Sequence, residues 1–410
     1  MKKIIVQKYG GSSLSTITKI KKVAQKIVNR FKEGEQVVVV VSAMGKETDR
    51  LLSMAHQISL SPDKREIDML ISTGEQVSIA LLAIAIQQLG KEAISFTARH
   101  AGILTDEVHT KARLIEINSK KIEKALNSEK IVIVAGFQGI NNRDEITTLG
   151  RGGSDVTAVA LAIQLKADLA EIYTDVDGVY TADPNLVTKA QRISEISYDE
   201  MSEMSVLGAQ VMHQRAIDLA RKFNLPILVK STFRPVKGTI ITKEVSMLEN
   251  VIVRGVSYQK NVARITLQGV KKNVDIACDL FEELAKKEIV IDTIVQDFYD
   301  QDSVTISFIV TEDDFVPSLH ITKEIAGKIG VKEIHSNCKL AKVSIIGDGI
   351  AKEAGIASRM FRALSRAGIQ METINTSRIR ISCLIHQSDV EKAVNVIHEE
   401  FELSQIKKEL

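Results

Sequence analysis

Short apolar runs alternate with stretches of helical spacing through most of the first 231 residues of the chain. Runs that are apolar throughout are typical of strands buried on both faces of a parallel sheet. Their regular alternation with helical segments predicts an α/β domain, a largely parallel sheet sandwiched by helices. The predicted strands cover residues 3–7, 37–41, 131–135, 169–174 and 227–231.

Glycine-rich or polar segments follow four of these predicted strands. They cover residues 8–12, 42–48, 137–139 and 174–183. The carboxyl ends of parallel strands meet at one edge of a sheet, and ligands of open α/β sheets bind there. The sequence therefore predicts a binding site built from several loops at that edge.

The segment 147–155, TTLGRGGSD, is predicted to be the centre of this site, because it leads from the third apolar run into a helix at 156–167. Glycines at 150, 152 and 153 allow the backbone to approach a ligand closely. The free N–H groups of a helix N-terminus attract anions, and Arg151 adds a fork suited to a carboxylate or phosphate. Ser154 can donate to such a ligand, and Asp155 can orient a lysine or a cation. An ordinary glycine turn capped by Ser154 or Asp155 is the alternative.

Two further loops carry candidate chemistry. The segment KYGGSS at 8–13 joins a strand to a helix, the geometry that cradles phosphates, although GxxxxGK[ST] and GxGxxG are both missing from the chain. Lys8 supplies the cation that a transferring phosphoryl group needs. In the loop 174–184 carboxylates can hold a metal or a ribose and Tyr180 can pack on a base, but Asp and Gly also simply form turns.

Two polar residues have simpler explanations. Glu75 stands at the start of an apolar helix, where the helix dipole favours a carboxylate. His213 is predicted to lie in the middle of a helix, between Val211 and Ile217, and a packed or surface histidine is a more common interpretation than a catalyst.

The pattern loosens between residues 233 and 258, and beyond this boundary the chain repeats itself. The segment AKVSIIG at 341–347 matches ARITLQG at 263–269, and FxxL and IxxxTI motifs follow in both copies. Each copy is predicted to be a ferredoxin-like α+β module, and a pair of such modules suggests ligand sensing. The predicted domains are 1–245, 263–335 and 341–410, and a strand at 249–258 can complete the last.

Composition narrows the function classes. A net charge of +2, 4% aromatic residues and no Trp give no reason to expect nucleic acid as a partner. The longest apolar run, 79–86, is far shorter than the ~20 residues that span a bilayer, so no membrane partner is expected. Three scattered cysteines and a start without a signal pattern predict a cytoplasmic protein.

Five segments together resemble the aspartate kinases, which have an amino-acid-kinase domain followed by two ACT modules. They are KYGGSS at 8–13, SAMGKETDRLL at 42–52, STGEQVS at 72–78, GRGGSD at 150–155 and TDVDGVYTADP at 174–184. Related kinases of glutamate, carbamate or UMP share the sheet but not this set. The implied reaction converts ATP and L-aspartate to ADP and 4-phospho-L-aspartate, with Mg²⁺ on the ATP phosphates. It is the first step towards lysine, threonine and methionine.

The resemblance also assigns roles to residues. Lys8 would stabilise the transferring group, Asp155 would organise Lys8, and Glu75 and Arg151 would hold the amino group and a carboxylate of aspartate. The other ATP-binding residues would be Gly10, Gly11, Ser12, Thr174, Asp175, Tyr180 and Asn185. The other aspartate-binding residues would be Thr48, Phe137 and Ser154. Asn185 and Gln210 stand where many members of the family carry a cation.

Regulation by an inhibitory amino acid is implied as well. Its binding positions would be Val290, Ile291, Asp292, Gln296, Gly355, Ile356, Gln370, Met371 and Ser377. Asp292 would accept the amino group of the effector, and lysine, possibly with threonine, is the expected effector, although Arg378 replaces the family's usual glutamate. The modules imply a homodimer or higher oligomer, and some relatives also start a separate C-terminal chain internally, for which Met247 is suitably placed.

Two other functions compete with this interpretation. A catalytically weak amino-acid sensor with a degenerate nucleotide site is favoured by Asn185 and Gln210, and disfavoured more strongly by the intact Lys8, Arg151 and Asp155. A sibling kinase acting on another carboxylate or on a carbamate is the second alternative, and the aspartate-side matches argue against it.

Overall fold

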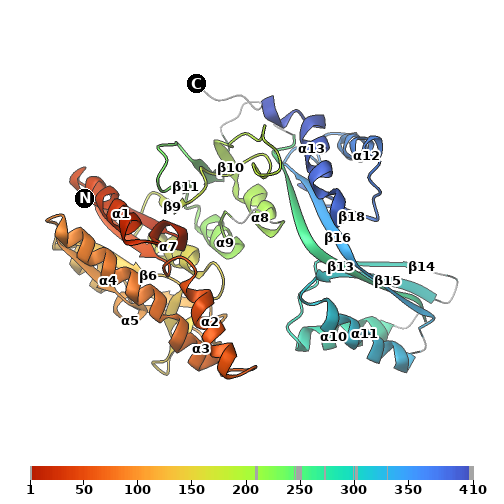
Figure 1. Cartoon of the computed structure of the whole chain (residues 1–410), viewed down its shortest axis with the longest axis horizontal. Helices are drawn as coiled ribbons and strands as arrows, with labels where there is room; N and C mark the ends of the chain where they lie inside the picture. The colour runs from red at the N-terminus through yellow and green to blue at the C-terminus, as the bar shows by residue number, and fades with distance from the viewer. Residues whose placement is uncertain are drawn as a thin grey trace. The chain divides into compact units, whose positions relative to one another are not determined.

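The computed structural model describes residues 2–207, 211–243, 245, 252–271, 274–298, 300, 303–329 and 331–405. The chain forms two compact units (Figure 1). The N-terminal unit contains Met1–Tyr180 and Arg192–Glu249, and the C-terminal unit contains Thr181–Gln191 and Asn250–Lys407.

An eight-stranded sheet forms the centre of the N-terminal unit, and all neighbouring strands are parallel except β11 and β12. In spatial order the strands are β10 (Glu195–Ser197), β12 (Thr239–Thr242), β11 (Ile227–Ser231), β9 (Ala170–Thr174), β1 (Ile4–Tyr9), β2 (Gln36–Val41), β6 (Ile131–Ala135) and β3 (Ala93–Phe96). The predicted largely parallel sheet is therefore confirmed. All five predicted apolar runs are strands in it.

Helices cover both faces of this sheet, which explains why residues 37–41 of β2 and all residues of β6 are apolar. On one face Val37, Val39 and Val41 share a core with buried residues of α1 and α4, which lie side by side in Figure 1. On the other face α7 packs against β1, β2 and β9. The helices are α1 (Ile17–Lys32), α2 (Glu47–Ile58), α3 (Lys64–Ile71), α4 (Thr73–Gln88), α5 (Ala98–Ala101), α6 (Lys120–Asn127), α7 (Gly153–Gln164), α8 (Tyr198–Val206) and α9 (Gln214–Phe223).

A second, four-stranded sheet in this unit was not predicted. Its order is β5 (Leu114–Ile117), β4 (Ile103–Thr105), β7 (Gln138–Ile140) and β8 (Ile146–Thr148). Strands β7 and β8 form an antiparallel hairpin, and β8 leads directly into the glycine turn that precedes α7. The small sheet therefore positions the segment that the sequence analysis placed at the centre of the site.

The helical stretch Lys64–Gln88 is long and apolar enough to cross a membrane by length and composition alone. Half of its most apolar window is buried inside the protein, and α4 supplies Ile79, Leu82 and Ile86 to the core beside the sheet. Packing of this kind accounts for the apolar composition without a membrane.

The C-terminal unit contains one antiparallel six-stranded sheet. Its order is β14 (Thr293–Phe298), β15 (Ser303–Thr311), β13 (Gly255–Lys271), β16 (Glu333–Ile346), β18 (Arg380–His386) and β17 (Thr373–Thr376). Helices α10 (Val274–Lys286) and α11 (Phe315–Ile329) lie together beside one half of the sheet, and α12 (Ile356–Arg366) and α13 (Val390–Glu400) beside the other half (Figure 1).

The two copies of the repeat differ in the origin of their last strand. The first copy reads strand, helix, two strands, helix, strand, from β13 to β16, as predicted. In the second copy the described residues after α13 form a 3₁₀ turn, Leu403–Gln405, where the repeat predicts a strand. The start of β13 takes that place, because Gly255–Gln259 pairs with Lys342–Ile346 of β16.

The segment 181–191 departs from the predicted domain of residues 1–245, since it belongs to the C-terminal unit. Ala182 and Val187 are buried in the same core as Val343 and Met360. Thr181 Oγ1 lies 2.9 Å from His398 Nε2 on α13. Apolar burial and this buried polar contact tie the segment to the second copy of the repeat.

Glu171 on β9 is the centre of a buried polar network between the sheet and α1. Its carboxylate accepts hydrogen bonds from Gln7 Nε2 and Tyr173 Oη, both at 2.8 Å, and lies within 3.5 Å of the cationic groups of Arg30 and Lys230. The Glu171 side chain is only 3% exposed. A carboxylate buried to this degree is stable only when such partners compensate its lost hydration.

We predict that Glu171→Gln lowers the free energy of unfolding of the N-terminal unit by about 3 kcal/mol, because Arg30 and Lys230 lose their buried counter-charge. Urea denaturation followed by circular dichroism measures the change. The matched control is Glu129→Gln, which removes an exposed pair with Lys2 and should cost less than about 1 kcal/mol. Equal losses in both variants would contradict the assignment.

Candidate active site

Lys8 and Asp155, which the sequence analysis joined only by hypothesis, meet in the structure. In β1, Ile5 and Tyr9 belong to the core that includes α1, so Lys8 points to the opposite face, where α7 packs. Lys8 Nζ lies 2.6 Å from Asp155 Oδ1, and the two side chains are 13% and 8% exposed. The lysine is therefore held in a fixed direction at the carboxyl end of β1.

The N-terminus of α7 presents the glycine turn to this lysine. The residue at the N-cap is Gly152, so neither Ser154 nor Asp155 caps the helix as the simpler alternative required; both lie in its first turn. Gly152 has a φ of +72°, and a Cβ there would lie 2.2 Å from the Cβ of His213. Asp155 Oδ2 also accepts a hydrogen bond from the backbone N–H of His213 at 3.3 Å. His213 thus packs over the turn, but the predicted position in the middle of a helix was wrong, because His213 caps the N-terminus of α9.

The predicted phosphate turn after β1 is locked against the loop after β2. A Cβ on Gly11 would lie 2.7 Å from the carbonyl oxygen of Ala43, so only glycine fits this position. Gly45 N donates to Gly11 O at 2.9 Å, and Gly10 N lies 3.4 Å from Tyr173 O of β9. Ser12 O accepts a hydrogen bond from Lys19 Nζ at 2.8 Å. Gly10, Gly11 and Ser12 therefore lie beside Lys8, at the edge where β1, β2 and β9 end.

Glu75 is buried in the first turn of α4 with one carboxylate oxygen in use. Its Oε1 accepts a hydrogen bond from Ala43 N at 2.9 Å, while Oε2 has no hydrogen-bond partner among the described residues. Burial is the main reason that the pKa of this carboxyl rises to about 8, and the hydrogen bond from Ala43 opposes it. A buried oxygen without a partner is suited to receive the ammonium group of a ligand. Thr48 lies half-buried in the first turn of the neighbouring α2.

Phe137 and Ser154 lie at the end of β6. Phe137 has a φ of +69°, and its N–H donates to Thr157 Oγ1 of α7 at 3.2 Å. The Phe137 ring packs on a small apolar cluster that contains Leu51 of α2 and Ile71 of α3. Ser154 is buried against Gly136, the residue that follows β6. Arg151 is exposed in the turn between them.

The loop after β9, which is predicted to border a nucleotide, contacts a cation that the sequence analysis missed. Arg234, in the loop after β11, pairs with Asp177 at 2.8 Å and donates to the carbonyl of Asp175 at 3.2 Å. Tyr180 Oη donates to Asp177 at 3.4 Å, and Thr174 Oγ1 donates to Asp175 at 3.0 Å. Adjacency of strands β9 and β11 brings this arginine to the loop, and sequence spacing alone does not show that adjacency.

Two positions predicted near the nucleotide differ from the others. Asn185 belongs to the C-terminal unit, where it donates to Asp183 through both its backbone and its side chain. Gln210 lies outside the described residues. Within the described residues no three His, Cys, Asp or Glu side chains gather as metal ligands.

The predicted effector residues all lie in the C-terminal unit. Asp292, the expected acceptor of an amino group, pairs at 2.8 Å with Lys342, a buried lysine on β16. Val290 is 75% exposed. The remaining positions follow or belong to elements of both modules: Ile291, Gln296 on β14, Gly355 and Ile356 at the start of α12, Gln370, Met371 and Ser377.

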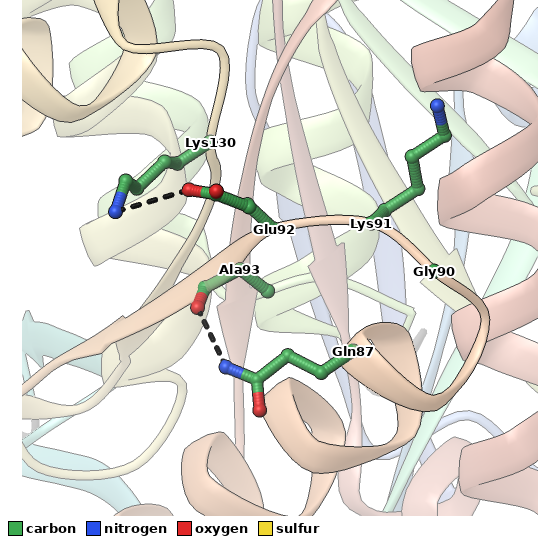
Figure 2. A pocket seen from close by; sticks show the side chains of 6 residues that line it. All are labelled: Gln87, Gly90, Lys91, Glu92, Ala93 and Lys130. Carbon is green, nitrogen blue, oxygen red and sulfur yellow. Dashed lines mark hydrogen bonds and ion pairs between the residues drawn. The ribbon is translucent and has the colours of Figure 1, made fainter.

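A pocket lined by Gln87, Gly90, Lys91, Glu92, Ala93 and Lys130 lies at the turn before β3 (Figure 2). Gln87 donates to the carbonyl of Ala93, and Lys130 pairs with Glu92 at 3.1 Å. Residues 93 and 131 begin β3 and β6, so the pocket lies at the amino ends of the strands. It is therefore at the opposite edge from the site that Lys8 and Asp155 form.

Known proteins match both units. The model of the amino acid kinase family matches residues 3–231, and that of the ACT domain matches residues 343–401. An aspartokinase of Bacillus sp. strain MGA3 is 45% identical over 98% of both chains. The chain belongs to the aspartokinase family.

Solved structures of aspartokinases agree on the fold. Escherichia coli aspartokinase III in complex with aspartate and ADP is similar with a TM-score of 0.83 and 24% identity, over 97% of this chain and 99% of that one. The same enzyme with lysine and aspartate gives a TM-score of 0.76 at 24% identity, over the same shares. As a member of the aspartokinase family the chain is a phosphotransferase, and its acceptor is a carboxyl group of aspartate.

We predict that Glu75→Gln stabilises the protein relative to wild type increasingly as pH rises from about 5 to about 8. In the unfolded chain the carboxyl loses its proton above 4.5, whereas in the folded protein it keeps the proton until about pH 8. The unfolded state therefore binds fewer protons in this window, so stability falls with pH, by an amount on the order of a few kcal/mol.

Thermal unfolding midpoints of the two proteins, measured across this range, give the difference directly. Glu66→Gln, a change at an exposed position of α3, is the control and should show no comparable trend. A difference between wild type and Glu75→Gln that stays constant with pH would show that Glu75 ionises normally.

Proposed function

We propose that the chain transfers the γ-phosphoryl group of ATP to the side-chain carboxylate of L-aspartate, giving 4-phospho-L-aspartate and ADP. The observation that carries this proposal is the Lys8–Asp155 ion pair beside Gly10 and Gly11. It supplies a fixed cation where two anions, a carboxylate and a polyphosphate, must approach each other.

The nucleophile needs no general base, because the carboxylate of aspartate is already ionised near neutral pH. Catalysis then consists of positioning and charge neutralisation. Asp155 directs the Lys8 ammonium, which neutralises charge on the transferring group. The N–H groups of the turn at Gly10, Gly11 and Ser12 line the phosphates, and Thr174, Asp175 and Tyr180 border the nucleotide. Mg²⁺ enters with ATP, held by the phosphate oxygens.

Aspartate is held on the other side of the cation. Glu75 accepts the α-amino group through the buried oxygen that has no partner among the described residues. An ammonium group there favours the ionised carboxylate, so binding removes the proton that burial retains. Arg151 binds a carboxylate of the substrate, while Thr48, Ser154 and Phe137 complete the pocket. Arg234 is an additional cation at the loop after β9, and for Asn185 a nucleotide role rests on the resemblance alone.

The pathway role and the regulation also remain proposals. The product is the first intermediate towards lysine, threonine and methionine, and an inhibitory amino acid binds the ACT modules. Lysine is the first choice as effector, supported by the lysine complex of the E. coli enzyme. Lys342 already neutralises Asp292, so an effector amino group has to compete with that pair. Arg378 also weakens the preference for a cationic effector, which keeps threonine as the second choice.

Association of two or more copies is proposed from the ends of the C-terminal sheet. Strands β14 and β17 are its outermost strands, and β14 exposes Ile294 (51%) and Phe298 (76%). Exposed apolar edge strands pair readily with another chain. We therefore propose a homodimer or higher oligomer through these edges.

Three further statements of the sequence analysis are kept as proposals. We keep the division into a catalytic domain of residues 1–245 and ACT modules of residues 263–335 and 341–410 as a proposal, with the segment 181–191 assigned to the C-terminal unit. A separate C-terminal chain would begin at Met247, which lies outside the described residues. A cytoplasmic location rests on the scattered cysteines.

The proposed reaction predicts ADP release from ATP with L-aspartate and much less with L-glutamate, measured by a coupled assay. Lysine, alone or with threonine, should reduce the rate. If neither aspartate nor glutamate supports ADP release but lysine still binds, the sensor is favoured. A preference for glutamate would favour the sibling kinase.

The assigned roles predict that Lys8→Ala lowers kcat about a hundredfold or more, because it removes a cation at the transferring group. Arg151→Ala should mainly raise the KM for aspartate, since it removes a contact to a substrate carboxylate. Both variants should keep the wild-type circular dichroism spectrum. Lys2→Ala, at an exposed lysine of the same N-terminal segment, is the control. Near wild-type turnover of Lys8→Ala would refute its assignment.

A further inference from the structure

The guanidinium group of Arg215 donates hydrogen bonds to the backbone near the glycine turn. Nη1 donates to the carbonyl of Leu149 at 2.5 Å, and Nη2 donates to the carbonyl of Ala112 at 3.0 Å. The side chain comes from the first turn of α9 and is half-buried. Burial lowers the pKa of this guanidinium, although arginine keeps its charge at any relevant pH. A half-buried charge that donates to two carbonyls can hold a loop in one position.

The two carbonyls belong to segments that are already joined to each other. Ala112 N donates to Thr148 O at 2.9 Å, and Leu149 N donates to Phe137 O at 2.8 Å. Arg215 therefore closes a bridge between the 106–113 loop and the last residue before Gly150. Arg151 follows only two residues after the carbonyl that Arg215 holds.

The other side of the same segment is anchored by Asp68 of α3, whose side chain is fully buried. Its carboxylate accepts hydrogen bonds from Thr148 Oγ1 at 2.5 Å and from Thr110 N at 3.0 Å, and it lies 2.8 Å from His109 Nδ1. The segment that leads into the turn with Arg151 is thus held from two helices. Asp68 of α3 binds Thr148, and Arg215 of α9 binds the carbonyl of Leu149.

We propose that Arg215 is a positioning residue of the phosphoryl transfer, which sets the direction of Arg151 by fixing the carbonyl of Leu149. The proposal rests on the proposed binding of a substrate carboxylate by Arg151. Nη1 and Nη2 of Arg215 each donate to a backbone carbonyl of the segments that support the turn, so these contacts act on the turn. Aspartate recognition should therefore depend on it more than ATP recognition does.

Arg215→Lys tests this, because lysine keeps the charge but cannot hold two carbonyls in a fork. We expect kcat/KM for aspartate to fall about tenfold to a hundredfold, since small misplacements of a binding group have effects of that size. The KM for ATP should change by less than about twofold. Arg221→Lys on the same helix, where the arginine pairs with Asp199 at the surface, is the matched control and should behave like wild type.

A double-mutant cycle with Arg151→Lys separates positioning from general loosening of the fold. If Arg215 acts through Arg151, the double variant should lose little more than Arg151→Lys alone. Added guanidinium ion should restore part of the aspartate activity of Arg215→Ala, an effect that a purely structural lesion would not show.

Several results would overturn the proposal: equal effects on aspartate and ATP, additive losses in the cycle, or kinetics of Arg215→Lys that match Arg221→Lys. Arg215→Lys can also lower the thermal unfolding midpoint of the protein. In that case the guanidinium rescue and the double-mutant cycle still distinguish positioning from loss of stability, because both compare activities of folded protein. Turnover of aspartate by the wild type in the same assay tests the proposed function separately. Its absence would be a failure of that function and not of the positioning role alone.

Discussion

The ion pair between Lys8 and Asp155 joins the strand and the helix on which the rest of the site depends. Lys8 belongs to β1, near the middle of the sheet, and Asp155 to α7, which crosses the face of β1, β2 and β9. Each group supplies the counter-charge that compensates the lost hydration of the other. The cation is also held in one direction before any anionic ligand arrives.

The buried carboxyl of Glu75 contrasts with that of Asp155. Glu75 accepts a backbone hydrogen bond from Ala43 and pairs with no cation among the described residues, so burial raises the pKa of its carboxyl to about 8. The two arrangements differ because Lys8 and Asp155 pair within the protein, whereas Glu75 Oε2 has no hydrogen-bond partner among the described residues. The proposed reaction uses both: Lys8 supplies a permanent cation for the phosphates, and Glu75 becomes an anion when the amino group of the substrate binds. In this proposal, specificity for a substrate with an amino group arises from Glu75, whose Oε2 is left without a partner when that amino group is missing.

Sequence patterns predicted the elements whose burial is complete. Runs such as 37–41 and 131–135 are apolar because both faces of the parallel sheet are covered, and they were located almost to the residue. Strands β4, β7 and β8 are three residues long and carry no measurable period, so the small sheet below the glycine turn went unnoticed. The loops of the site were found because glycine is conspicuous in a sequence. The side chains that hold them, such as Arg215, Asp68 and Arg234, were not, because their partners are backbone atoms or residues far along the chain.

The repeat in the C-terminal unit shows why similarity between copies does not imply that each copy folds alone. Strand β13 has 17 residues and serves both modules: its beginning pairs with the end of β16, and its remainder pairs with β15 and the beginning of β16. The second module therefore takes its last strand from a segment that precedes the first module in sequence. Residues 181–191 add Ala182 and Val187 to the same core. Since the second module depends on a segment that precedes the first, the stability of the C-terminal unit is a property of one continuous sheet and not the sum of two independent domains.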